Sequence, residues 1–253
     1  MLVQSSAGFK MIAAAALLIL GAARAQSADS AFNRDSAGVI ESLAASARGG
    51  VLPVFGNVPP GTMTDAQRQA LVESLPLFAG ERDGRPVDAV NLVFVGSEAK
   101  VKALLEGARW TAVPSSLKES IGDVLRGRLK RFPPFSRLFI ARRPQAMNWN
   151  RPVSFESRHH FRVWLSALAE PRGRAVWPTA GTFDRRIRWD PVPDHVADPC
   201  VDEERAYIQA SLAGNPLIAR MTLVPSPKMP HEWTTNRQRR STDGRVLVVE
   251  LVP

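Results

Sequence analysis

The 253-residue sequence contains a single cysteine, Cys200, so no disulfide can form within the chain. Stability must therefore come from a hydrophobic core, and 45% hydrophobic with 23% charged residues is typical of a globular protein. Cys200 is then a small apolar core residue, a free thiol or an intermolecular link, and we expect the first because free cysteines are usually buried. The sequence has no phosphate-binding loop, Gly-x-Ser-x-Gly turn, paired-cysteine metal motif or dinucleotide-binding glycine pattern. No short motif therefore assigns a reaction.

Acidic residues are also fewer than basic ones, 24 against 33, which gives a formal net charge of +9. The arginines and lysines are scattered, with short clusters at 126–131 and 237–240 and no long basic run. No known nucleic-acid-binding motif accompanies this charge, so we expect no nucleic-acid partner. The basic excess is compatible with association at an anionic membrane surface.

The N-terminus has the pattern of a secretory signal peptide. Residues 1–10 carry one Lys and no acid, residues 11–23 are apolar, and Ala23 and Ala25 supply small side chains before a cleavage point. The apolar run is too short for a comfortable transmembrane helix. We therefore expect residues 1–25 to be removed and the protein to be periplasmic or secreted. An uncleaved N-terminal anchor is the alternative.

Composition divides the remaining chain into three segments. Residues 26–85 are rich in small and polar residues and predict a variable, partly flexible region with one short helix capped by Thr64. Residues 86–215 predict the compact domain, including a helix over 116–127. Residues 216–253 predict two strands, joined by a long polar loop, that complete this domain.

Apolar runs and turn residues predict the sheet. Residues 89–96 are too apolar for a half-exposed strand and predict a buried one, followed by a helix capped by Ser97. The stretch 154–166 predicts a strand that pairs antiparallel with 174–189. A further helix follows Asp198, which is the expected N-cap. The fold class is therefore α+β: a mixed, largely antiparallel sheet with about three flanking helices in a single compact domain.

The strand at 154–166 carries the most concentrated polar pattern of the chain. Because side chains of a strand alternate between faces, Arg158, His160 and Arg162 point one way. His159 points the other way, toward the core, where we expect it to be a hydrogen-bonded core histidine.

Several segments, in order, resemble the C-terminal domain of LssY, a bacterial family named for a component linked to a type I secretion locus. They are "DAVNLVFVGSEAKVKALLEGARW", "FSRLFIARRPQA", "SRHHFRVW", "VWPTAGTFDR" and "HVADPCVDEERAYI". The resemblance covers roughly 86–212. This sequence departs from the family pattern at Ala146, Val196 and Cys200, where Asp, His and an acid are usual.

The resemblance implies a fold and a bacterial cell-envelope context, but it implies no activity. Larger relatives join this domain to membrane phosphatase-type segments. The Pro-Ser-Gly-His motif of that phosphatase is absent from this sequence. Phosphatase activity is therefore not implied for this chain.

Acidic and basic side chains further along could complete a site with the arginine face of 158–162. They are Asp184, His195, Asp198, Asp202, Glu204 and Arg205. In one hypothesis Arg158, His160, Arg162 and Arg205 bind an anion, because guanidinium groups suit phosphate and carboxylate oxygens. The expected partner is then an anionic small molecule or an envelope lipid.

Two other hypotheses use the same residues. His160 and His195 with Asp184 or Asp202 could hold a divalent metal for hydrolysis, but nearby arginines compete with a metal. Alternatively the residues form a structural network, in which Arg158 and Arg162 pair with Asp184 and Asp202. We assign no metal and no cofactor from the sequence.

The favoured function is an exported cell-envelope accessory or binding module of the LssY C-terminal type. The alternative is a hydrolase that acts on a phosphorylated or lipid-like envelope substrate, with His160, Asp184, His195 and Asp202 as candidate catalytic residues. A hydrolase requires these groups to converge in an open cleft, whereas buried ion pairs would argue against it.

Overall fold

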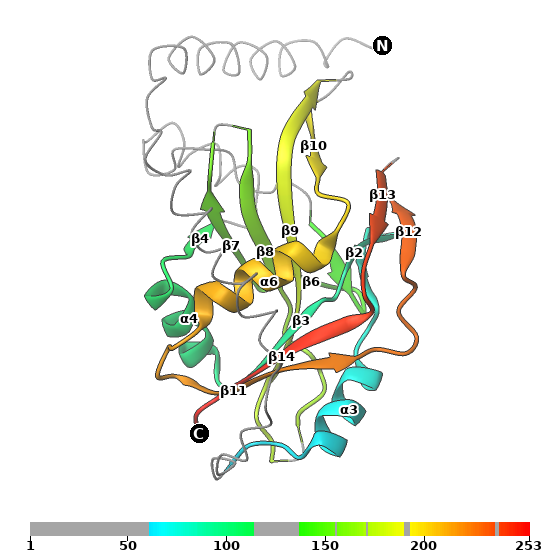
Figure 1. The fold of residues 1–253 in the computed structure, drawn as a ribbon. Coiled ribbons are helices and arrows are strands. Elements are labelled where there is room, and N and C mark those ends of the chain that lie inside the picture. Colours follow the sequence, from blue (N-terminus) through cyan, green and yellow to red (C-terminus); the bar gives the residue numbers. More distant parts are fainter. Residues whose placement is uncertain (1–60, 114–136, 155, 171, 190–192, 236–237) are drawn as a thin grey trace, which may run out of the picture. The chain divides into compact units, whose positions relative to one another are not determined.

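The computed structural model describes residues 61–113, 137–154, 156–170, 172–189, 193–235 and 238–253 (Figure 1). The expected signal peptide and the expected helix over 116–127 lie outside the described residues. Within the described ranges, no helix has the length and apolar character needed to span a membrane.

Eight strands form the main sheet, in the order β11-β14-β3-β9-β8-β7-β4, with β10 added beside β9 (Figure 1). Among these described pairs, all are antiparallel except β14 with β3. The strands are β3 (Leu92–Val95), β4 (Thr111–Val113), β7 (Met147–Pro152), β8 (Arg158–Val163), β9 (Val176–Trp189), β10 (Pro193–Ala197), β11 (Ile218–Pro225) and β14 (Arg245–Leu251). The expected pairing of 154–166 with 174–189 is confirmed as the β8–β9 pair.

A second, smaller sheet has the order β2-β1-β5-β6. Its strands are β1 (Phe78–Gly80), β2 (Pro86–Ala89), β5 (Phe139–Ile140) and β6 (Arg143–Pro144). Ala79, Val87 and Leu138 of this layer pack against Trp164 and Ala180 of the main sheet. The small sheet therefore covers the face of β8 on which the arginines were expected.

In the described part of the chain, three helices flank the main sheet: α3 (Asp65–Ser74), α4 (Glu98–Gly107) and α6 (Val201–Leu212). Thr64 caps α3 in a reciprocal capping box with Gln67, and Ser97 caps α4, so both expected caps are confirmed. Leu71 and Val72 of α3 pack on the same face as the small sheet. The expected α+β fold with a mixed, mostly antiparallel sheet and three helices is confirmed.

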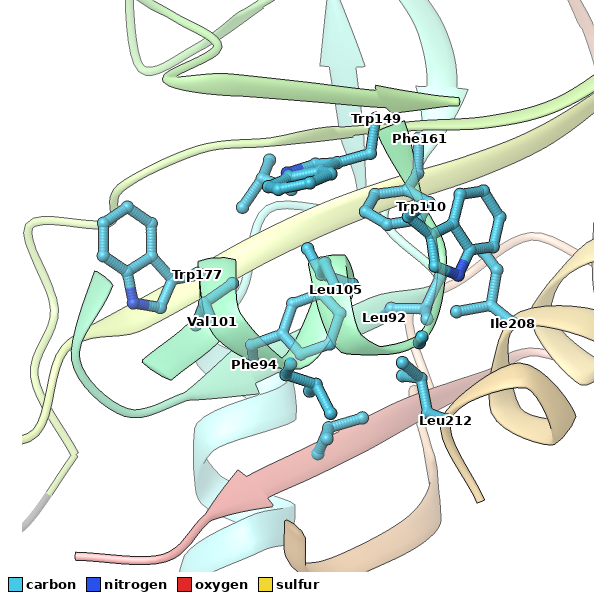
Figure 2. Close-up of a cluster of buried hydrophobic side chains, with 14 of the residues drawn as sticks. Leu92, Phe94, Val101, Leu105, Trp110, Trp149, Phe161, Trp177, Ile208 and Leu212 are labelled. Carbon is cyan, nitrogen blue, oxygen red and sulfur yellow. The ribbon is translucent and has the colours of Figure 1, made fainter. Parts of the chain in front are cut away.

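Helices α4 and α6 cover the opposite face and enclose the largest apolar cluster (Figure 2). Val101, Leu104 and Leu105 supply the inner stripe of α4, as its sequence predicted. An aromatic pair adds to this core: Trp110 lies edge-to-face with Phe161, and their ring centroids are 4.6 Å apart. Burial of each large side chain contributes roughly 1.5–3 kcal/mol, so this cluster stabilises the domain without a disulfide.

Strand β9 pairs with β3 at its start and with β10 at its end, and Asn91 bridges the gap between these two partners. The Asn91 side chain accepts from the Gly181 N–H (2.8 Å) and donates to the Gly181 carbonyl (3.0 Å). A Cβ on Gly181 would lie 2.6 Å from Ile208 Cδ1 of α6. The absence of a side chain at Gly181 therefore lets α6 approach β9 closely.

Helix α6 begins later than the sequence indicated, and Asp198 is not its N-cap. The N-cap is Cys200, while an Asp198 oxygen accepts the Cys200 N–H at 2.9 Å. Cys200 forms a parallel bridge with Ser241, whose N–H donates to the Pro199 carbonyl at 2.7 Å. This pairing holds Cys200 in an extended conformation, and the helix begins at Val201. The Cys200 side chain is half-buried rather than in the core, contrary to expectation.

The expected polar loop between β11 and β14 contains a hairpin, β12 (Glu232–Thr235) with β13 (Gln238–Ser241). Its side chains are largely polar, so the segment lacks the apolar alternation that predicts a strand. Gln238 reaches from this hairpin to the free edge of β10. Its side chain donates to the His195 carbonyl (2.9 Å) and accepts from the Ala197 N–H (3.0 Å), so it positions β10.

Candidate functional site

Asp184 is the centre of the polar cluster on the covered face of β8. Arg158 lies directly across from it in the β8–β9 register, and Arg158 Nε donates to Asp184 Oδ2 at 2.9 Å. Arg158 is 5% exposed and Asp184 is 3% exposed. The pairing of these two residues, expected in the structural-network hypothesis, is confirmed. The Arg158 guanidinium, which the anion-binding hypothesis assigned to a ligand, is therefore engaged by Asp184.

Two histidines converge on the same carboxylate oxygen. His160 Nδ1 and His195 Nδ1 each lie 3.4 Å from Asp184 Oδ2. His160 is buried, whereas the His195 side chain is 27% exposed and is the most accessible member of the cluster. The structure therefore brings together three of the four candidate catalytic residues: His160, Asp184 and His195.

The register of β9 with β10, which contains a β-bulge, decides which side chains share the face of Asp184. In the β9–β10 register Val196 lies opposite Arg186, but Ala197 lies opposite Asp184, so Arg185 is an extra residue. The extra residue reverses the alternation of β9 beyond this point. His195 is two residues from Ala197 on β10, so it lies on the same face as Ala197 and Asp184, whereas Arg186 lies with Val196 on the other face.

Arg162 is paired differently from the expectation. Its Nη1 donates to Asp88 Oδ2 of β2 at 2.6 Å, and it lies 3.4 Å from His160 Nε2. The expected partner Asp202 lies elsewhere. Asp88 is 74 residues away in sequence and belongs to the small sheet, so no local pattern linked it to Arg162.

Electrostatics in this cluster favour one ionised carboxylate beside a neutral histidine. Burial alone would raise the pKa of Asp184, but the neighbouring His160, Arg158 and His195 outweigh it and lower that pKa below its usual value. Burial lowers the pKa of His160 well below 6.5, so this ring is neutral near neutral pH. Arg158 is therefore the principal counter-ion of Asp184.

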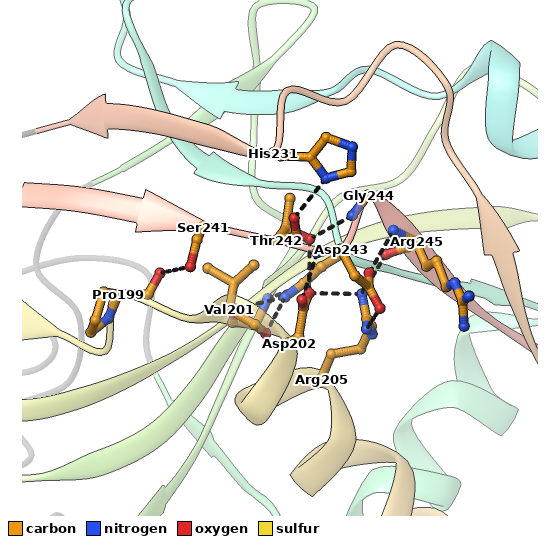
Figure 3. Close-up of polar contacts among 12 residues, drawn as sticks. Pro199, Val201, Asp202, Arg205, His231, Ser241, Thr242, Asp243, Gly244 and Arg245 are labelled. Carbon is orange, nitrogen blue, oxygen red and sulfur yellow. Dashed lines mark hydrogen bonds and ion pairs between the residues drawn. The ribbon is translucent and has the colours of Figure 1, made fainter.

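Asp202 and Arg205, two further predicted site residues, lie in a separate cluster around the turn before β14 (Figure 3). Arg205 makes a two-pronged contact with Asp243, at 2.9 and 2.8 Å. Asp202 accepts from the Thr242 hydroxyl (2.7 Å) and the Asp243 N–H (2.6 Å). These contacts fasten α6 to the 241–245 turn, so the two halves of the predicted site do not form one site.

On the other face of β8, His159 fills a partly buried position against α6. Its ring stacks on Tyr207, with centroids 3.6 Å apart, and its Nδ1 lies 2.5 Å from Glu204 Oε2. Burial lowers the pKa of His159 to about 3 and raises the pKa of Glu204 well above its usual value. These directions favour a neutral pair in which the protonated Glu204 donates to His159. The expectation of a hydrogen-bonded histidine on the core side of the strand is confirmed.

Sequence reasoning missed a second buried ion cluster, centred on Glu250 of β14. Glu250 is fully buried and accepts from Arg68 Nη1 and the Met63 N–H, each at 2.7 Å. Arg174 reaches it at 3.3 Å and also pairs with Glu170. An acid within the apolar run "RVLVVELV" was the available signal, because a buried carboxylate needs a cationic partner. The cluster ties α3 to β14 and has a structural role.

The described parts of the chain contain no group of three or more His, Cys, Asp and Glu side chains arranged to hold a metal ion. In the Asp184 cluster, the ion pair between Arg158 and Asp184 disfavours a metal site. Arg158 occupies Asp184 Oδ2, the oxygen that a metal ion would need.

Exposed arginines lie beside the buried cluster, on β9. Arg185 and Arg186 line a surface depression of about 380 Å3 together with Val196 of β10. The Arg185 side chain is 56% exposed and the Arg186 side chain is also exposed. Sequence reasoning did not select these residues, because their meeting at one depression depends on the bulge.

The fold and the cluster define an α+β domain whose polar strand face is closed by internal ion pairs. The sequence model of the family described as LssY C-terminus matches residues 64–246, well over half of the chain. The chain therefore belongs to the LssY C-terminus family, as the resemblance indicated. No curated protein and no solved structure matches the chain significantly.

Proposed function

We propose that this protein is an exported accessory module of the bacterial cell envelope that binds an anionic partner. The N-terminal signal-peptide pattern supports export. The net charge supports an anionic partner, since the +9 of the full sequence falls only to +7 when Lys10 and Arg24 are removed with residues 1–25. The observation that carries the proposal is that some arginines are buried in ion pairs and others are exposed. Arg158 and Arg162 are buried with carboxylates, whereas Arg185 and Arg186 face solvent.

This proposal moves the ligand away from the residues first expected to bind it, Arg158, His160, Arg162 and Arg205. A ligand on the β8 face would have to displace Asp184 or Asp88 from a buried guanidinium. Breaking a buried ion pair costs about 3–5 kcal/mol, which most small anions could not offset. The exposed guanidinium groups of β9 carry no such cost.

A hydrolase that acts on a phosphorylated or lipid-like envelope substrate is the second candidate. The convergence of His160 and His195 on Asp184 favours it, because a carboxylate that orients a histidine is a common general-base arrangement. The burial of Asp184 and its pairing with Arg158 weigh against it. His195 alone has the exposure that proton transfer to a substrate requires.

A thermal-shift titration of the purified protein separates the two candidates. Inorganic phosphate should raise the melting temperature relative to chloride at equal ionic strength, because a ligand that binds the folded state stabilises it. A phosphate monoester such as p-nitrophenyl phosphate should do the same and remain intact. Turnover of this ester that disappears in His195→Ala, with folding retained, would favour the hydrolase.

Export is tested by the N-terminus of the mature protein. Mass spectrometry of the periplasmic or secreted fraction should find a chain that starts at Gln26, after cleavage behind Ala25. A chain that retains Met1 and sediments with membranes would instead support the uncleaved anchor.

A further inference from the structure

Two consecutive arginines of β9 line one depression, which a regular strand does not allow. Neighbouring side chains of a strand point to opposite faces of the sheet. Arg185 and Arg186 nevertheless both border the depression of about 380 Å3, with Val196 beside them. A local irregularity must therefore redirect one of the two side chains.

The β-bulge supplies this irregularity. Arg186 pairs with Val196 and Asp184 pairs with Ala197, which leaves Arg185 as the extra residue between them. A bulge bends the strand and changes the direction of the extra side chain. The extra residue thus brings two guanidinium groups to one surface depression.

Among the side chains that the structure describes, one carboxylate lies near the two guanidinium groups. Arg185 Nε lies 3.6 Å from Asp198 Oδ2, a loose contact between partly exposed side chains. In the part of the chain that the structure describes, Arg186 has no carboxylate partner. The nearby Asp184 is engaged by Arg158. The described lining of the depression therefore carries more cationic than anionic groups.

Asp198 is held in place independently of Arg185. Its Oδ1 accepts the Cys200 N–H at 2.9 Å, while Oδ2 faces Arg185. One oxygen therefore fixes the turn before α6, and the other is the internal counter-ion of Arg185. A ligand at the depression would compete with this second oxygen alone.

We propose that Arg185 and Arg186 form a binding site for a phosphate-type oxyanion, with Asp198 as an internal competitor that limits its affinity. This site deepens the proposed function and rests on it. Guanidinium groups present paired N–H donors that match the oxygens of a phosphate group. Val196 provides an apolar wall, so the phosphate of a mono- or diester, with its organic substituent, is the ligand class that fits.

Calorimetric titration of the full-length protein with inorganic phosphate and with glycerol phosphate tests the site. Arg185→Ala and Arg186→Ala should each weaken binding by about tenfold or more, the effect of losing one charge-assisted contact. Asp198→Asn should tighten binding several-fold. Asparagine keeps the oxygen that accepts the Cys200 N–H, but it removes the competing charge.

Arg82→Ala is the matched control, because Arg82 is an exposed arginine in the turn before β2. It removes the same formal charge and should leave binding unchanged. All four variants change exposed or half-exposed side chains, and an unaltered melting temperature without ligand verifies their folding. Equal weakening by Arg82→Ala would mean that only the overall charge matters, and it would overturn the site.

Vesicles of phosphatidylcholine with and without phosphatidylglycerol distinguish a lipid headgroup from a soluble phosphate group. Binding to anionic vesicles that Arg185→Ala abolishes, without measurable binding of glycerol phosphate, assigns the site to a lipid. Binding of both probes assigns it to the phosphate group itself.

The two levels of the proposal fail differently. Wild-type protein that binds neither phosphate compounds nor anionic vesicles would overturn the proposed function together with the site. Wild-type binding that Arg185→Ala, Arg186→Ala and Asp198→Asn leave unchanged would overturn the site alone.

Discussion

Replacement of Asp184 by Asn is the sharpest perturbation of the buried cluster. Asparagine has nearly the same shape, so the substitution removes charge without opening a cavity. Asp184 is the carboxylate beside Arg158, His160 and His195. The Arg158 side chain is only 6% exposed. The variant therefore leaves a buried cation without its counter-ion.

The expected cost of Asp184→Asn is about 3–5 kcal/mol in the free energy of unfolding, the usual range for breaking a buried ion pair. For a domain of this size, that loss lowers the melting temperature by roughly 6–20 °C. The cost depends on pH. Because the folded-state pKa of Asp184 is lowered, its stabilising contribution is present above the unfolded pKa of about 3.9 and is lost as the pH falls.

Urea denaturation followed by tryptophan fluorescence measures this cost near neutral pH and in acid. Asp83→Asn is the control, because Asp83 is exposed in the turn before β2. The double variant Arg158→Met/Asp184→Leu should recover most of the lost stability, since apolar residues can replace both members of a buried pair. A cost below about 1 kcal/mol for Asp184→Asn would refute the assignment of Asp184 as a buried counter-ion.

Three further substitutions test other parts of the structure. Glu204→Gln should raise the free energy of unfolding at about pH 8 and leave it unchanged at about pH 4. The folded-state pKa of Glu204 is raised, so ionisation of this buried carboxyl costs stability as the pH rises, and Gln removes that cost. A lower free energy of unfolding at neutral pH would instead show an ion pair with His159. Gly181→Ala should cost about 1–3 kcal/mol in urea denaturation, because the new methyl group would meet Ile208; a smaller loss would mean that α6 shifts freely. Arg205→Lys should cost about 1–2 kcal/mol without changing phosphate affinity, since lysine cannot make the two-pronged contact; weakened binding would return Arg205 to the ligand site.

Local rules predicted much of the architecture. Hydrophobic patterns and capping residues identified the helices that Thr64 and Ser97 begin, and strand alternation placed Arg158 and His160 on one face of β8. These features depend on residues within a few positions of one another, where propensity and side-chain direction dominate. The pairing of β8 with β9 was predictable because the two strands are consecutive in the chain, with residues 164–175 between them.

The candidate site was only partly predictable, because its contacts depend on features with no local signature. The extra residue Arg185 cannot be recognised from sequence, yet it decides the face on which Arg186 lies. The Arg162–Asp88 pair joins two different sheets. Sequence reasoning therefore did not select Arg185 and Arg186 of β9, which form the exposed charged surface together with Val196 of β10.

Helix α6 shows how tertiary contacts override a strong local pattern. The sequence favoured Asp198 as the N-cap, with proline following it. Pairing with Ser241 keeps Cys200 extended, and Asp198 instead accepts the Cys200 N–H and faces Arg185. Because β13 lies about forty residues further along, the early pattern could not reveal the competition.

The location of a bound oxyanion tests the central claim most directly. A crystal of the protein soaked in tungstate, a heavy-atom mimic of phosphate, gives an anomalous signal that marks the ion without reference to any binding hypothesis. The account predicts a peak within hydrogen-bonding distance of Arg185 and Arg186, beside Val196. A peak among Arg158, His160 and Arg162, or no peak at the β9–β10 depression, would contradict it.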